Sequence, residues 1–285
     1  MADEGTSSTA SSSPVPTGYL VLDTESVPDG RLLGKVKYAG EDLSPEDAIT
    51  RAQAEARETS WNNSDFLPVT FQLPVAVCII RVGVDYRLQN IVCLDAPQFQ
   101  TPEIVKKFWK GVGDLWSQQD HKRTRRASLV TFNGRNFDMP LLELAAFRYG
   151  CACGSSYFQG TRKRFESSHL DLQEWLTNFG AWKVAGGLNL LSKILGKPGK
   201  MEMAGDQVYG LFQAGRLQEI NDYCMFDTLD TYFVFLRSRV LCGDLVLDQE
   251  QQLVREAKQF LIDRQAQLTG LEKYLANWGD WQPWP

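Results

Sequence analysis

The stretch Tyr19-Leu20-Val21-Leu22-Asp23-Thr24-Glu25-Ser26 joins an apolar run to a pair of acidic side chains. The apolar run predicts a strand that is buried on both faces of a sheet. Asp23 and Glu25 are two residues apart, so on a strand their side chains point to the same face. Two carboxylates side by side at the end of a buried strand repel each other unless a proton or a hard metal ion lies between them. The alternative is a strand that ends in a solvated acidic turn, and this stretch alone leaves both interpretations open.

Length and composition indicate a globular protein. The 285 residues with a hydrophobic fraction of 43% can fill the core of one large α/β domain with appendages, or of two small domains. No apolar run reaches the roughly 18 residues that span a bilayer, and no basic segment followed by an apolar one opens the chain. We therefore expect a cytoplasmic protein. The six cysteines are scattered, and Cys151-Ala-Cys153 lacks a second ligand pair at zinc spacing, so neither a disulfide framework nor a zinc site is indicated.

The charge distribution bears on nucleic acid as a partner. A net charge of -5 argues against a protein that coats nucleic acid through bulk electrostatics, but not against an enzyme that handles it locally. Basic clusters at residues 122–126, 162–164 and 197–200 interrupt a generally acidic sequence. Each cluster is either a solvated loop or one part of a groove that follows a phosphate backbone.

Two segments near the beginning of the chain lack the pattern of a buried strand. Residues 1–17 are rich in Ser, Thr, Ala and Pro without apolar periodicity, which predicts a disordered tail. Residues 28–74 form a long excursion between strands, in which Ser44-Pro45-Glu46-Asp47 predicts the start of a helix that ends near Glu58. Insertions of this length are more often functional than idle, but the sequence does not indicate what this one contacts.

The order of the next elements predicts an α/β fold. Strands are expected at residues 75–82, 90–94 and 128–132, with a turn between the first two and a helix at residues 101–116 before the third. When the first strand is included, the only connection that crosses over the sheet is the last one, from the strand at residues 90–94 through the helix to the strand at residues 128–132. The prediction is a mixed sheet with three leading antiparallel strands and helices packed against it.

A second candidate site segment follows directly. Asn133-Gly134 breaks the strand at residues 128–132, and Arg135-Asn136-Phe137-Asp138 leads into a helix expected at residues 141–149. Asp138 therefore lies where a strand hands over to a helix, which is where open α/β sheets place ligand-binding groups. The alternative is an ordinary acid at a helix start, stabilised by the helix dipole.

The third candidate segment lies on a helix. Apolar residues recur at helical spacing over residues 217–236, and Tyr223 and Asp227 are four residues apart, so they share a face. They either carry chemistry or form a structural hydrogen-bonded pair.

Taken together, these segments resemble the three motifs of the DEDDy 3′-5′ exonucleases of the RNase H-like superfamily. The motifs are D-x-E at Asp23 and Glu25, N-x-x-x-F-D ending at Asp138, and Y-x-x-x-D at Tyr223 and Asp227. The chain is similar to stand-alone bacterial proteins that resemble the proofreading exonuclease domain of family B DNA polymerases. Residues 168–172 and 196–201 look like segments that this group has between its second and third motifs.

The resemblance covers residues 18–239 and implies an exonuclease domain with an RNase H-like fold over residues 18–245. A C-terminal helix at residues 247–276 and a Trp-rich end complete the chain in residues 246–285. That helix either packs back on its own domain or contacts a partner, since exposed aromatic residues often anchor interfaces. No oligomeric state is indicated.

The activity that the resemblance implies is metal-dependent hydrolysis of phosphodiester bonds from the 3′ end of DNA, with single-stranded DNA favoured and nucleoside 5′-monophosphates as products. Two Mg²⁺ or Mn²⁺ ions would take part, and both ions prefer carboxylate oxygen and water. By resemblance, Asp23, Glu25 and Asp227 hold the first ion. Asp23 bridges to the second ion, and Asp138 supports that ion through water. Tyr223 would orient the attacking water.

Alternatives to this activity stay open. The protein could be an RNA 3′-5′ exonuclease, because the distinction depends on contacts to the 2′-hydroxyl that no motif reports. It could also be a nucleic-acid-binding module that has kept the fold with little turnover, although the complete carboxylate set counts against this. Phe132 and Phe137 either stack on bases at the 3′ end or pack in the core.

Overall fold

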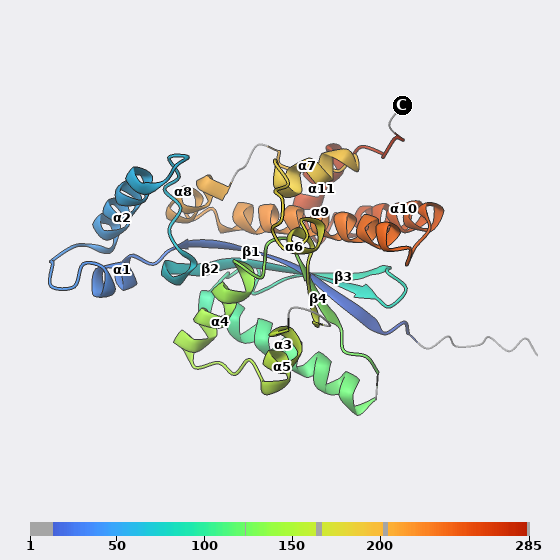
Figure 1. Cartoon of the computed structure of the whole chain (residues 1–285), viewed down its shortest axis with the longest axis horizontal. Helices are drawn as coiled ribbons and strands as arrows, with labels where there is room; N and C mark the ends of the chain where they lie inside the picture. Colours follow the sequence, from blue (N-terminus) through green and yellow to red (C-terminus); the bar gives the residue numbers. More distant parts are fainter. Residues whose placement is uncertain (1–13, 123, 164–166, 202–204, 284–285) are drawn as a thin grey trace, which may run out of the picture.

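The computed structural model describes residues 14–122, 124–163, 167–201 and 205–283, and shows helices on both faces of a central sheet (Figure 1). Within these residues the sheet is open and has five strands in the order β3-β2-β1-β4-β5. β1 pairs antiparallel with β2 and β2 with β3, whereas β4 runs parallel to β1 and β5 parallel to β4. The predicted mixed sheet with three leading antiparallel strands is therefore confirmed, and it is consistent with an RNase H-like fold. The strands are β1 (Thr17–Pro28), β2 (Gln72–Gly83), β3 (Leu88–Cys93), β4 (Ser128–Thr131) and β5 (His169–Asp171).

The side chains of β1 alternate between two hydrophobic cores. Leu20 and Leu22 join the core under α3 (Thr101–His121) and α4 (Asp138–Tyr149). Val21 joins the core under α9 (Leu217–Cys242), the long helix on the other face. Because strand residues alternate with a period of two, Asp23 and Glu25 continue the face of Val21. The binary pattern of β1 thus directs both carboxylates toward α9.

The insertion between β1 and β2 has a small core of its own. It contains α1 (Gly30–Val36), α2 (Pro45–Thr59) and the 3-10 turn η1 (Val69–Phe71), and its buried residues include Leu33, Ile49 and Leu67. As predicted, the Ser44 side chain accepts a hydrogen bond from the Asp47 amide and caps α2. The seven-residue α1, capped by Asp29, was not predicted from the sequence.

Several elements differ from the expectation. The helix expected to end at residue 116 runs to His121. β5 was not predicted, nor were the short helices between β4 and α9. The expected helix over residues 247–276 is two helices, which both contact α9. The unpredicted helices are α5 (Ser155–Thr161), α6 (Leu172–Leu176), α7 (Gly187–Ile194) and α8 (Val208–Gln213), and the last two helices are α10 (Leu247–Arg264) and α11 (Gly270–Ala276).

The expected disordered tail lies outside the described residues up to residue 13. Its last part belongs to the fold, because the Val15 carbonyl accepts a hydrogen bond from Gln89 and the Pro16 carbonyl accepts one from the Val84 amide. β1 begins at Thr17, whose hydroxyl also bonds Gln89. Among the described helices, none has the length and apolar character needed to cross a membrane.

Candidate active site

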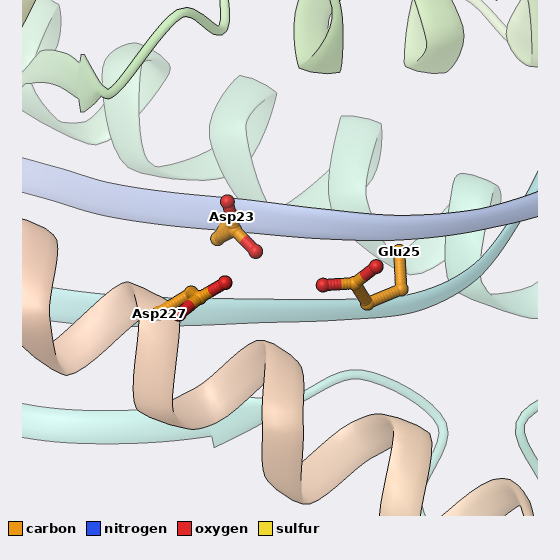
Figure 2. A group of neighbouring side chains, drawn as sticks. All are labelled: Asp23, Glu25 and Asp227. Atoms are coloured by element: carbon orange, nitrogen blue, oxygen red, sulfur yellow. The ribbon is translucent and has the colours of Figure 1, made fainter. Parts of the chain in front are cut away.

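Three carboxylates converge between β1 and α9 (Figure 2). Asp23 and Glu25 project from β1 toward the helix, and Asp227 projects from α9 toward the strand. One oxygen from each side chain lies within 4.8 Å of the other two. The spacing of two on the strand and the position of Asp227 on the facing helix produce this arrangement. The structure therefore brings together three of the four predicted carboxylates.

Asp138, the fourth predicted carboxylate, lies beside this cluster. It is the first residue of α4 and only 3% of its surface is exposed. The Thr24 hydroxyl donates a hydrogen bond of 2.6 Å to Asp138 Oδ1. Thr24 lies between Asp23 and Glu25 on β1, so the same strand also holds Asp138 in place. The role of Thr24 was not predicted, because a contact across 114 residues leaves no local signal.

Electrostatics sets the protonation state of the cluster. Burial raises the pKa of Asp23 well above its ordinary value, and the next largest cause is the charge of Asp138. Burial and the charge of Asp227 do the same to the pKa of Glu25. Burial raises the pKa of Asp138 to about 7 and that of Asp227 to about 6. The protein alone therefore does not supply enough positive charge to keep all four groups ionised at low cost.

The charges around the cluster fit a divalent cation. No lysine or arginine among the described residues forms an ion pair with any of the four carboxylates. The positive charge of Lys200 lowers the pKa of both Glu25 and Asp227. The donor set consists of carboxylate oxygen only, which suits hard ions such as Mg²⁺ or Mn²⁺ rather than zinc.

Tyr223 lies one turn before Asp227 on α9 and is 7% exposed. Its hydroxyl acts on the Asp227 carboxylate and opposes the rise in the Asp227 pKa that burial causes. Burial and the charge of Asp227 raise the pKa of Tyr223. The tyrosine hydroxyl therefore keeps its proton at neutral pH and can donate a hydrogen bond rather than act as a base.

A cavity of about 720 Å³ opens beside Tyr223 and Asp227. Its volume is in the range of small-molecule sites, which usually combine apolar walls with a few polar groups. The walls come from α8, α9, α11 and the segment before α8. The apolar lining includes Met201, Leu211 and Phe226, and the polar lining includes Arg216, Glu219, Asp222, Thr269 and Lys273.

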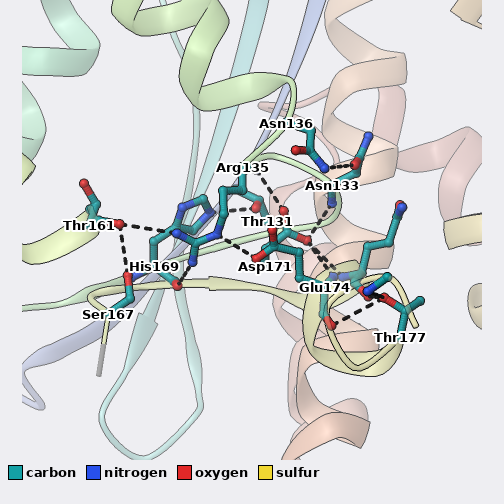
Figure 3. A network of polar contacts seen from close by, with 12 residues as sticks. Thr131, Asn133, Arg135, Asn136, Thr161, Ser167, His169, Asp171, Glu174 and Thr177 are labelled. Carbon is teal, nitrogen blue, oxygen red and sulfur yellow. Dashed lines mark hydrogen bonds and ion pairs between the residues drawn. The ribbon is translucent and has the colours of Figure 1, made fainter. Parts of the chain in front are cut away.

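The loop that carries Asp138 is held by a polar network (Figure 3). The carboxylate of Asp171, at the end of β5, accepts hydrogen bonds from the amides of Asn133 (3.0 Å) and Arg135 (2.8 Å). The same carboxylate accepts from the amides of Gln173 and Glu174, which caps α6. One buried side chain thus fixes both the loop after β4 and the helix after β5.

Arg135 ties the same loop to its surroundings. Its guanidinium bonds the carbonyl of His169 (2.9 Å) and forms an ion pair with Glu174 (2.7 Å). Gly134, in the same loop, packs so closely that a Cβ there would lie 2.7 Å from Asp138 Oδ2 and 2.5 Å from the Thr131 side chain. The loop is therefore fixed by hydrogen bonds on one side and by contact with Asp138 on the other.

We expect Asp171→Ala to lower the rate of the reaction at this site as well as the stability. The substitution leaves buried amides without an acceptor, at a cost of about 1 to 3 kcal/mol each, and releases the loop that places Asp138. Melting curves and reaction rates measured well below the melting temperature would separate the effects. The matched control is Asp95→Ala, which removes another carboxylate that accepts a hydrogen bond from a backbone amide and whose side chain is only 7% exposed. Equal destabilisation with no loss of rate in either variant would contradict a positioning role for Asp171.

The remaining candidates lie in different environments. Phe132 packs against the core under α9, whereas the half-buried Phe137 has its ring 5.6 Å from the ring of Phe66, an exposed residue of the insertion. Of the basic clusters, Arg126 pairs with Asp120 and Arg162 with Glu143. Lys197 is buried. Three of the seven described cations in these clusters are therefore paired or buried.

A comparison with protein families finds a match over most of the chain. The family described as "predicted 3'-5' exonuclease related to the exonuclease domain of PolB" matches residues 64–278. The matched residues include Asp138, Tyr223 and Asp227, and they extend past α11 to Trp278, beyond the end expected from the motifs alone. Asp23 and Glu25 precede them, and the structure supplies their connection to the matched part. A comparison with curated proteins finds no match.

Proposed function

Because the chain belongs to the family of predicted 3′-5′ exonucleases related to the exonuclease domain of PolB, we propose that its acidic cluster hydrolyses phosphodiester bonds at the 3′ end of single-stranded DNA. The products are nucleoside 5′-monophosphates. The observation that carries the proposal is the convergence of Asp23, Glu25 and Asp227 beside Tyr223 and an open cavity.

The carboxylates are assigned as metal ligands in this proposal. Asp23, Glu25 and Asp227 hold one Mg²⁺ or Mn²⁺ ion, and Asp23 together with Asp138 supports a second. Divalent cations in such a site activate water and stabilise the charge on the attacking and leaving oxygens. Burial, followed by repulsion from the other carboxylates, raises the pKa of Asp23 and Glu25. This supports the assignment, because a bound cation relieves the repulsion.

The other residues act on water and substrate. Tyr223 donates its hydroxyl hydrogen bond and orients the attacking water, as its raised pKa keeps the proton in place. The cavity beside Tyr223 and Asp227 admits the end of the strand. Lys200, an exposed cation that acts on Glu25 and Asp227, is placed to offset the charge of an incoming phosphate. Phe137 and Phe66 offer ring faces to bases upstream of the end.

The test is degradation of a 5′-labelled single-stranded DNA oligonucleotide with MnCl₂. The expected result is a ladder of products shortened from the 3′ end, with nucleoside 5′-monophosphate released and no reaction in EDTA. A single-stranded RNA and a duplex DNA of the same sequence form the other arms. Faster degradation of RNA than of DNA would shift the proposal to an RNA exonuclease. Binding of the oligonucleotide without any metal-dependent shortening would overturn the enzymatic proposal in favour of a binding module.

A further inference from the structure

A buried lysine without an ion-pair partner lies two residues before Gly199, which lines the cavity of the candidate site. Lys197 is 3% exposed and forms no ion pair among the described residues. Its ammonium group lies 3.8 Å from the centre of the Trp278 ring and 5.3 Å from that of Phe233, and it donates a hydrogen bond of 3.0 Å to the Gly279 carbonyl. Burial lowers its pKa to about 8. A buried cation is costly unless its surroundings compensate it, so this aromatic and carbonyl cage is a specific attachment point.

The backbones meet at the same place. The Gly279 amide donates to the Gly196 carbonyl at 2.8 Å. A Cβ on Gly196 would lie 2.9 Å from the backbone of Asp280, and Gly196 has a φ of +70°, so two requirements favour glycine here. The segment 278–281 and the loop 196–200 therefore pack directly against each other.

The segment 278–281 is in turn fixed to three helices. The Trp278 ring lies edge-on to Phe233 of α9, at 5.1 Å, and to Tyr274 of α11, at 6.1 Å. Lys258 of α10 lies over the same ring and 3.8 Å from the carboxylate of Asp280. The segment 278–281, the part of the Trp-rich end for which contacts are described, thus packs back on the chain's own helices and supports the loop.

The other end of the loop faces the carboxylate cluster. Gly199 lines the cavity together with Tyr223 and Asp227. Lys200 follows it, and its amide donates to Asn189 Oδ1 at 2.8 Å, which fixes the backbone at the point where the side chain leaves. Only Pro198 and Gly199 separate the caged Lys197 from Lys200, so a shift of the cage moves the exposed ammonium group.

We propose that Trp278 and Lys197 are positioning residues: the segment 278–281 holds the loop 196–200 so that the Lys200 ammonium group stays at the carboxylate cluster and offsets the charge of the substrate phosphate. This inference rests on the proposed function, and it extends the site to residues outside the three motifs that hold the carboxylates and Tyr223. In this proposal, the contacts of Trp278 and Lys197 affect the reaction only by positioning Lys200.

A double-mutant cycle tests it, with single-turnover rates on a single-stranded DNA oligonucleotide in Mn²⁺. We expect Trp278→Ala to lower the rate about tenfold, since small displacements of a positioned group have effects of this order or larger. In the Lys200→Ala background the same substitution should change the rate less than twofold. Trp278→Phe keeps a ring over the ammonium group and should retain most of the rate. Equal losses from Trp278→Ala in both backgrounds would overturn the proposal.

A second readout does not depend on activity. Trypsin should cleave after Lys200 faster in Trp278→Ala than in the wild type, while Trp61→Ala, which removes a ring that is 94% exposed, should leave cleavage unchanged. Should Trp278→Ala fail to fold, Lys197→Met removes the hydrogen bond to Gly279 and serves in both measurements. Unchanged cleavage after Lys200 would contradict the attachment itself. A wild type without metal-dependent activity would instead refute the proposed function, and the cleavage result would still report on the loop.

Discussion

Asp23→Asn is expected to lower the single-turnover rate about a thousandfold or more with little change in the fold. Stabilisation of charge by divalent cations contributes several kcal/mol to such reactions, and each 1.36 kcal/mol is a factor of about ten in rate. Asp23 is the residue on which the charges of all three other carboxylates act, so it lies at the centre of the group. The amide keeps the shape of the side chain and removes the charge, which makes it the cleanest test of the cluster.

The same variant should lose most of its thermal response to metal. Added Mn²⁺ or Mg²⁺ should raise the melting temperature of the wild type, because a ligand that binds only the folded state stabilises it by mass action. Without metal, Asp23→Asn should melt at a temperature equal to or above that of the wild type, since one repelling charge is gone. Equal melting shifts in wild type and variant on adding metal would show that the ions bind elsewhere.

The pH dependence has a definite sign. The carboxyl pKa values of the cluster are raised in the folded state, to about 7 for Asp138 and about 6 for Asp227. The folded protein therefore binds more protons than the unfolded chain from about pH 4 up to these pKa values. Without metal, these groups therefore make the protein less stable as pH rises through their folded-state pKa values. Metal replaces the protons, and its stabilising shift should be larger at pH 8 than at pH 5.5. Melting curves at the two pH values, with and without MnCl₂, measure this.

Much of the candidate site was predictable because its residues lie on elements with strong local signals. The apolar run of β1 predicts a buried strand, and the period of two then places Asp23 and Glu25 on one face. Helical spacing over residues 217–236 predicts α9 and puts Tyr223 and Asp227 on one side of it. These local patterns fix which face of each element the acidic side chains occupy. The family resemblance then predicted that β1 and α9 bring these faces together.

The parts that were missed depend on contacts distant in sequence. β5 has three residues, which is too short for a periodicity, although Asp171 at its end repeats the strand-acid-helix pattern seen at Asp138. The bonds from Asp171 to the loop after β4 span 36 and 38 residues. The break between α10 and α11 was also missed. It coincides with Gly270, where a Cβ would lie 2.7 Å from the Asp222 side chain, so a tertiary contact sets it.

The support that the Trp-rich end gives to the loop 196–200 follows the same logic. Trp278 and Lys197 are 81 residues apart, and each looks like a surface residue in its own stretch of sequence. Only their contact at 3.8 Å shows that the lysine is buried under the ring. The residues that carry the chemistry are thus visible in the sequence, whereas those that hold them in place emerge from the packing.

Tyr223→Phe and Asp227→Ala separate chemistry from structure on α9 most sharply. Tyr223→Phe removes one hydroxyl and keeps the ring packed, so turnover should fall about a hundredfold, the scale of a lost proton-transfer or water-orienting group. The free energy of unfolding should change little, because the buried ring of Tyr223 keeps its packing in the core under α9. Asp227→Ala should remove activity and the thermal response to metal together, because it deletes a direct ligand of the first ion.

Asp227→Ala should nevertheless leave the metal-free protein as stable as the wild type or slightly more so. Burial raises the pKa of Asp227, which means that its charge is unfavourable in the folded state. If Tyr223 and Asp227 were only a structural hydrogen-bonded pair, removal of either partner would leave the other buried and unsatisfied. Both variants would then lose about 1 to 3 kcal/mol of stability and keep their turnover. Melting curves without metal, combined with single-turnover rates on a labelled oligonucleotide, distinguish the two cases. Two destabilised but active variants would refute the assignment of this helix to catalysis, and with it the exonuclease proposal.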